Sequence, residues 1–130
     1  MIKKLLLTLA LATSALRGER INPTGIWEAN FRGAIFLRIN ISANDAITGT
    51  VSVGGIGVDY EGNLLAAEPA SPDNESPILR ASLEGQILRF EIDDEGEITK
   101  MELQFDAEGK ATIHFPDLAQ KIKPIALERR

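Results

Sequence analysis

The chain has 130 residues, of which 44% are hydrophobic, and its 14 basic and 19 acidic side chains give a formal net charge of −5. It has no cysteine, so it forms no disulfide bond and carries no lipid on a cysteine. An acidic chain without a basic patch repels the phosphates of nucleic acids and of anionic lipids. These properties predict a small domain that its hydrophobic core alone stabilises, and they argue against nucleic-acid binding.

The first 15 residues have the pattern of a secretory signal peptide. Lys3 and Lys4 give a basic start, residues 5–12 form a largely apolar run, and the small residues 13–15 follow. An apolar run of about a dozen residues is too short to span a bilayer, which needs about 20. We therefore expect an exported protein, periplasmic or extracellular, that has no membrane span and from which residues 1–15 are removed.

The cleavage site sets the mature chain. Cleavage after Ala15 is the first expectation, and cleavage after Gly18 is the alternative. Residues 16–130 are close to the usual length of one domain, so we expect a single β-barrel domain over that range.

The rest of the sequence alternates between apolar and polar residues in short runs, as β-strands with one buried face do, and it contains no convincing helix. The clearest run is residues 34–42, where Ile35, Leu37, Ile39 and Ile41 face one way. Three prolines mark residues 67–77 as the one long loop. The expected strands lie near residues 25–31, 34–42, 46–53, 56–66, 79–83, 88–92, 100–105, 111–115 and 122–128.

The spacing of these strands predicts the fold class. Eight or nine short strands at intervals of about ten residues are typical of a sandwich or an up-and-down barrel. Tight turns between nearly all neighbours favour an antiparallel meander, and closing the sheet protects a small acidic chain from edge-to-edge aggregation. We therefore expect an all-β fold, an antiparallel up-and-down β-barrel of about eight strands.

The expected inner face carries no charged residue. It therefore offers no acid, base or nucleophile, and we expect neither enzymatic activity nor a cofactor. Its side chains either fill the barrel or leave room for a small apolar ligand, for which Trp27, Tyr60, Phe90 and Phe105 are the candidate binding residues. The inner positions are Trp27, Ala29, Phe31, Ile35, Leu37, Ile39, Ile41, Ile47, Val51, Val53, Val58, Tyr60, Leu79, Ala81, Leu83, Leu88, Phe90, Ile92, Met101, Leu103, Phe105, Ala111, Ile113, Phe115, Ile125 and Leu127.

Some apolar residues fall on the outer face of the expected strands. Ile26, Phe36 and Ile87 alternate with the inner residues and are expected outside. Scattered exposed apolar residues are ordinary, but a cluster of them would mark a surface for a protein partner or a dimer.

Metal binding has little support in the sequence. His114 is the one histidine, it is expected to point outward, and a single histidine without cysteine is a poor start for a zinc site. The acidic residues Asp93, Asp94, Glu95 and Glu97 lack the spacing of a calcium-binding loop and fit an ordinary hairpin turn. We therefore expect no bound metal.

Short motifs resemble a known group of barrels. The G-x-W of residues 25–27 and the T-G-T of residues 48–50 are similar to motifs of avidin-like and lipocalin-like small barrels. Residues 88–90 and 125–129 add the outline of a group of uncharacterised secreted bacterial domains. The resemblance implies a small barrel, in which Arg129 or Arg130 could pack over Trp27 in a cation–π contact. It does not extend to biotin, which avidins hold with several tryptophans, because this chain has one.

Two functional hypotheses remain. The leading one is a secreted, non-catalytic binding module that takes a small apolar ligand in the barrel or a protein partner on its surface. The alternative is a structural or accessory interaction domain with a solid core and no ligand.

The signal peptide generates the first testable prediction. N-terminal sequencing of the exported protein should begin near Leu16, because the small residues before it are those that a signal peptidase reads. An exported form that still begins with Met1 would contradict this assignment.

Overall fold

The computed structural model describes residues 21–106 and 109–130, so the expected signal peptide, residues 1–15, lies outside the described residues. The described chain consists of strands and one short 3₁₀ turn, Pro72–Asn74. The strands are β3 (Gly25–Phe31), β4 (Ala34–Ala43), β5 (Ile47–Val53), β6 (Ile56–Val58), β7 (Leu64–Ala67), β8 (Glu75–Pro77), β9 (Leu79–Glu84), β10 (Ile87–Asp94), β11 (Glu97–Phe105), β12 (Lys110–His114) and β13 (Ile125–Arg129).

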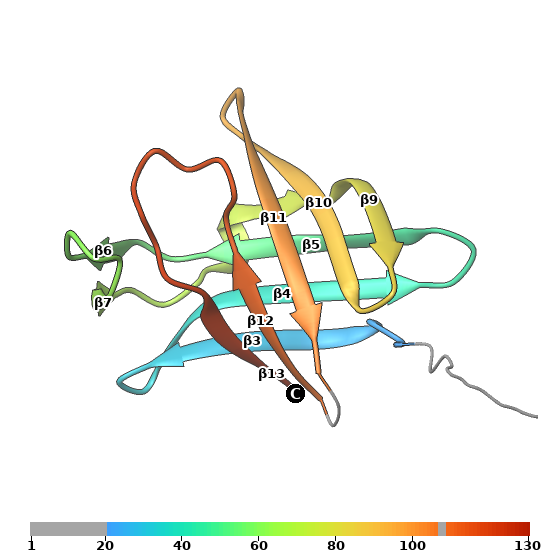
Figure 1. Ribbon diagram of the computed structural model, residues 1–130, viewed down its shortest axis with the longest axis horizontal. Helices are drawn as coiled ribbons and strands as arrows, with labels where there is room; N and C mark the ends of the chain where they lie inside the picture. The colour runs from blue at the N-terminus through green and yellow to red at the C-terminus, as the bar shows by residue number, and fades with distance from the viewer. Residues whose placement is uncertain (1–20, 107–108) are drawn as a thin grey trace, which may run out of the picture.

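Nine of these strands form one antiparallel sheet that curls into a nearly closed barrel (Figure 1). Their order is β8-β5-β4-β3-β13-β12-β11-β10-β9, while β6 and β7 form a separate two-stranded hairpin. The two outermost strands, β8 and β9, follow one another in the chain, and Ile78 between them donates its N–H to the Gly49 carbonyl at 2.9 Å. The all-β antiparallel barrel expected from the sequence is confirmed, with nine strands in the sheet.

Tight turns set the register of the meander. The turns after β3 and after β10 each place two successive residues at positive φ, Arg32 with Gly33 and Glu95 with Gly96. Two positive φ values define the type I′ turn, whose twist matches that of antiparallel strands. Asp94 consequently lies opposite Glu97, and the alternation of the two strands stays in phase.

The inner face of the barrel is the hydrophobic core. Because successive residues of a strand point to opposite faces, the apolar positions of each strand meet inside. Most of the inner positions expected from the sequence are buried. The buried apolar residues are Trp27, Ala29, Phe36, Leu37, Ile39, Ile41, Val51, Ile78, Leu88, Phe90, Ile92, Met101, Leu103, Phe105, Ala111, Ile113, Ile125 and Leu127.

The expectation for Phe36 is wrong, because its side chain is buried rather than outside. The pairing of β3 with β4 shifts register here: Ala29 lies opposite Leu37, but Asn30 lies opposite Ile35. Phe36 is the extra residue of a β-bulge, which interrupts the strict alternation of the strand.

The inner-face expectation for Tyr60 is also wrong, because Tyr60 is fully exposed. Val53 keeps its place on the inner side, opposite Leu37, but is 39% exposed because it lines the pocket at the barrel end. The run 56–66 is two strands, β6 and β7, joined by a turn that carries Tyr60. The Asp59 carboxylate accepts the backbone N–H groups of Glu61 and Asn63, both at 2.9 Å, and thereby fixes the turn. Tyr60, between these residues, projects into solvent.

The same turn perturbs the titration of Asp59. The backbone N–H of Asn63, followed by its side-chain amide at 3.1 Å, stabilises the charged carboxylate and holds the pKa of Asp59 below its usual range. Protonation of Asp59, which would remove the charged acceptor of the turn, therefore needs a lower pH than protonation of an ordinary aspartate.

Gly62 anchors this hairpin against the segment that precedes β13. Its φ is +91°, and its carbonyl accepts the N–H of Lys123 at 3.0 Å. A Cβ at this position would lie 2.9 Å from the Lys123 nitrogen and 3.1 Å from the Lys121 carbonyl oxygen. Both the backbone conformation and the close approach of the two segments therefore require glycine here.

Substituting this glycine tests the packing of the hairpin. Gly62→Ala and Gly96→Ala should each lose about 1–2 kcal/mol of unfolding free energy, because both glycines have φ near +90°. Gly96 has open space where its Cβ would lie, whereas Gly62 does not, so Gly62→Ala should lose roughly 1–3 kcal/mol more. Urea denaturation measures both losses, and equal losses would contradict the close packing at Gly62.

Candidate functional site

The structure separates the four candidate binding residues. Trp27, Phe90 and Phe105 lie in the core, each no more than 2% exposed, while Tyr60 lies outside on the β6–β7 turn. Trp27 and Phe105 are in contact, with ring centroids 5.0 Å apart and planes tilted by 58°. No single site contains all four residues, and Tyr60 does not join the other three.

Trp27 is held on several sides at one end of the barrel. Its indole Nε1–H donates to the Pro23 carbonyl at 2.8 Å, and the Arg129 guanidinium carbon lies 4.6 Å from the centre of its ring system. Arg129 also donates from Nη2 to the Asn22 carbonyl at 2.7 Å. The expected cation–π contact is therefore present and is made by Arg129, which closes this end of the barrel over Trp27.

Arg130, the other arginine considered for this contact, pairs elsewhere. Its Nη1 lies 3.5 Å from Oε2 of Glu28, a carboxylate oxygen that also accepts from Arg38 Nε at 2.8 Å. In the pairing of β13 with β3, Arg129 lies opposite Trp27. Arg130 follows Arg129 in the chain, so its side chain takes the outer face.

The core has almost no polar component. Ser52 is the one buried polar or charged residue in the described part of the chain, and its hydroxyl donates to the Ser71 carbonyl at 2.5 Å. A buried hydroxyl with a carbonyl partner is satisfied and is not poised for chemistry. Among residues 21–106 and 109–130, no three His, Cys, Asp or Glu side chains gather as metal ligands.

An acidic pocket of about 360 Å³ lies at the barrel end opposite Phe105. Val51, Val53 and Ile92 supply its apolar side chains. Its polar lining consists of Asn74, Glu75, Ser76, Asp93, Asp94 and Glu95. Asp93 is already engaged, because its Oδ1 accepts the N–H of Gly96 at 2.7 Å, so part of this acidic rim serves the β10–β11 turn.

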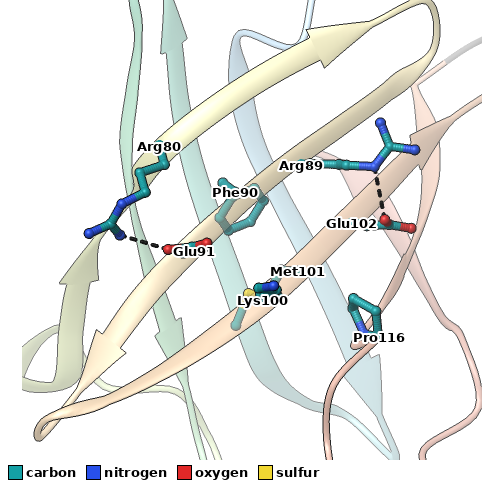
Figure 2. A pocket seen from close by; sticks show the side chains of 8 residues that line it. All are labelled: Arg80, Arg89, Phe90, Glu91, Lys100, Met101, Glu102 and Pro116. Carbon is teal, nitrogen blue, oxygen red and sulfur yellow. Dashed lines mark hydrogen bonds and ion pairs between the residues drawn. The ribbon is translucent and has the colours of Figure 1, made fainter.

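A charged groove of about 230 Å³ lies on the outer face of β9, β10 and β11 (Figure 2). Figure 2 shows Arg80 paired with Glu91 and Arg89 paired with Glu102, at 2.6 and 2.9 Å. Arg89 also pairs with Glu84 at 2.8 Å. Exposed pairs of this kind contribute about 0–1 kcal/mol each and neutralise one another, so the groove presents little unpaired charge.

His114 points outward from β12, as expected. Its side chain is about half exposed, and Nε2 lies 3.5 Å from Oε1 of Glu102. The contact connects β12 to the ion pairs on the outer face of β9, β10 and β11, and the histidine stays accessible to water.

A third pocket, of about 400 Å³, has mostly apolar residues in its lining and was missed by sequence reasoning. We call it the hairpin groove; it lies between the β3–β4 turn, the β6–β7 hairpin and the start of β13. Phe31, Phe36, Leu64, Pro124 and Ile125 supply its apolar side chains, and the other residues that line it are Asn30, Gly62, Asn63, Lys123 and Ala126.

Two exposed apolar side chains lie on the hairpin that borders this groove. Tyr60 is at the tip of the β6–β7 turn, and Leu65 on β7 is 56% exposed. The sequence feature that could have predicted an exposed apolar side chain here is the consecutive pair Leu64 and Leu65. Successive strand residues point to opposite faces, so when Leu64 lines the groove, Leu65 faces away from it.

Comparisons with known proteins gave no match: no protein family, no curated protein and no solved structure is recognisably similar to this chain. Within the described residues, no helix is long and apolar enough to cross a membrane.

The burial of Trp27 generates a prediction with a matched control. Trp27→Ala should lose about 3–5 kcal/mol of unfolding free energy, because it removes a fully buried indole and leaves a cavity. Tyr60→Ala removes an aromatic ring that is fully exposed and should change the unfolding free energy by less than about 0.5 kcal/mol. Chemical denaturation compares the two variants, and a Trp27→Ala protein of near-normal stability would place Trp27 on a binding surface instead.

Proposed function

We propose that this protein is an exported, non-catalytic binding module that engages a protein partner through its outer surface. The observation that carries the proposal is the filled interior. The aromatic side chains of the core are each no more than 2% exposed; they are Trp27, Phe36, Phe90 and Phe105. The space that a ligand would need in the barrel is taken by the protein's own side chains, as expected for a barrel of this size.

The hairpin groove is the surface that best suits a partner. Its lining contains apolar side chains, Tyr60 is exposed at the tip of the hairpin that forms one wall, and interfaces are enriched in such aromatic and apolar anchors. The groove has Lys123 and no acidic residue in its lining, although the whole chain is acidic. The partner proposed is therefore a protein segment that places an apolar side chain in the groove and a carboxylate beside Lys123.

The relationship to avidin-like and lipocalin-like barrels is also part of this proposal. The contact of Arg129 with Trp27 supports it, because lipocalin-like barrels place a late arginine over the tryptophan of their G-x-W motif. Export is proposed from the pattern of residues 1–15 alone.

Trp27 reports directly on whether the barrel accepts a ligand. Titration of the purified protein with a long-chain fatty acid or an apolar dye should leave its emission unchanged, because the single tryptophan lies in the filled interior. Native mass spectrometry should give the mass of the polypeptide alone. A co-purified lipid, or a saturable shift of the emission, would contradict the filled barrel and favour an apolar ligand.

Site-specific photo-crosslinking tests the partner surface. A photoreactive phenylalanine in place of Tyr60 should capture one discrete partner in the cells that produce the protein, and Lys123→Glu should reduce the yield several-fold. The same probe at Ile98, which is 49% exposed on β11, is the control and should capture none. Equal capture at both positions, or none at Tyr60, would favour the structural domain without a partner at this surface.

A further inference from the structure

The outer edge of β9 is an unpaired margin of the barrel sheet. β9 is the last strand in the sheet order and pairs with β10 alone, while its start lies against β5 where the sheet nearly closes, beside the hydrogen bond from Ile78 to Gly49 (Figure 1). The part of its outer edge farther along, around Leu83, has no strand partner. Ser82 and Arg80 on this strand are exposed, while Leu79, Ala81 and Leu83 are half-buried. A strand edge of this kind is a template for pairing with another strand.

The turn after β9 fixes which backbone groups are free. Gly85 has φ +60° and is the first of two residues between Glu84 and Ile87, which are partners across the hairpin. In a two-residue hairpin the flanking residues exchange hydrogen bonds, and bonded and non-bonded pairs then alternate. Glu84 and Ser82 therefore bond to β10, and Leu83 directs its N–H and C=O to the open edge.

The carbonyl group of Ala81 also points to the open edge of β9. The C=O of Ala81 and the N–H of Ser82 belong to one peptide plane and point in opposite directions. Since the N–H of Ser82 faces β10, the C=O of Ala81 faces the open edge. Beyond it the strand is bulged, with a register shift between Arg89 and Glu91 and a positive φ at Arg80, so the usable edge is short.

The side chains along this edge are self-complementary. Arg80 and Glu84 lie two residues before and two residues after Ser82, and their side chains are 66% and 74% exposed. An antiparallel copy of the strand centred on Ser82 would bring the long, exposed side chain of each Arg80, at the bulge, near Glu84 of the second copy. The same alignment places each Leu83 opposite Ala81 of the second copy, so that free N–H groups meet free carbonyls.

We infer that two copies of this chain pair through β9, antiparallel and two-fold symmetric about Ser82. The N–H of each Leu83 donates to the Ala81 carbonyl of the other copy, and each Arg80 pairs with Glu84 of the other copy. Charge and hydrogen-bond direction select the same register independently. The guanidinium of Arg80 has donors beyond the one that contacts Glu91, so both pairs can form together. The contact is short, so the dimer is weak.

Sedimentation equilibrium over about 10 µM to about 1 mM tests this pairing. The wild type should shift from monomer to dimer. Arg80→Glu alone and Glu84→Arg alone should both remain monomeric, because each creates two like-charge contacts across the axis. An equimolar mixture of the two variants should recover the dimer, since both contacts are then attractive. Far-UV circular dichroism confirms the fold of each variant, whose substitutions are on exposed side chains.

The equimolar mixture of the two variants tests the proposed alignment of the two β9 strands specifically. A wild type that stays monomeric at the highest concentration would overturn the self-pairing and leave the edge for a strand of another protein. A dimer that both single variants retain, or one that the mixture fails to recover, would place the interface elsewhere. None of these results depends on the partner proposed for the hairpin groove.

Discussion

The indole of Trp27 is the contact on which the rest of the barrel depends. Trp27 lies opposite Ile39 on β4 and opposite Arg129 on β13, so it joins the first two strands of the sheet to the last. Phe105 reaches it from β11, and the Pro23 carbonyl satisfies its N–H. The chain has no disulfide, so the pairing of β3 with β13 and the packing around Trp27 close the barrel here, and Arg129 covers the indole ring.

In the part of the chain that the structure describes, Ser52 is the one buried polar side chain, and its hydroxyl is hydrogen-bonded. The hairpin groove and the edge of β9, in contrast, place apolar side chains and backbone groups at the surface. Both lie where the chain departs from a simple meander: the β6–β7 hairpin is a separate two-stranded unit, and β8 and β9, which follow one another in the chain, are the two ends of the sheet order.

Alternation predicted the strands and most of the core because a strand repeats every two residues, a period visible in any run such as 34–42. It failed at Phe36, where a bulge interrupts the phase, and at Tyr60, where the Asp59 carboxylate draws the backbone into a turn. In both places the backbone departs locally from regular strand geometry, and the two-residue period of the sequence does not predict such departures.

The hairpin groove was beyond prediction for a different reason. Its lining comes from residues 30–36, 62–64 and 123–126, which only the three-dimensional fold brings together. The open edge of β9 likewise follows from the sheet order, in which the first strand pairs with the last and leaves β8 and β9 at the margins. By contrast, the resemblance to lipocalin-like barrels suggested a contact of Arg129 or Arg130 with Trp27, and the structure has it with Arg129.

Native-state hydrogen exchange tests the central role of Trp27 most directly. If packing around Trp27 holds the barrel together, the amides of β3, β4 and β13 near it exchange only through global unfolding and are the slowest of all. The free Leu83 amide on β9 exchanges far faster at concentrations where the protein is monomeric. Amides beside Trp27 that exchange as quickly as those at the margin of the sheet would contradict the account.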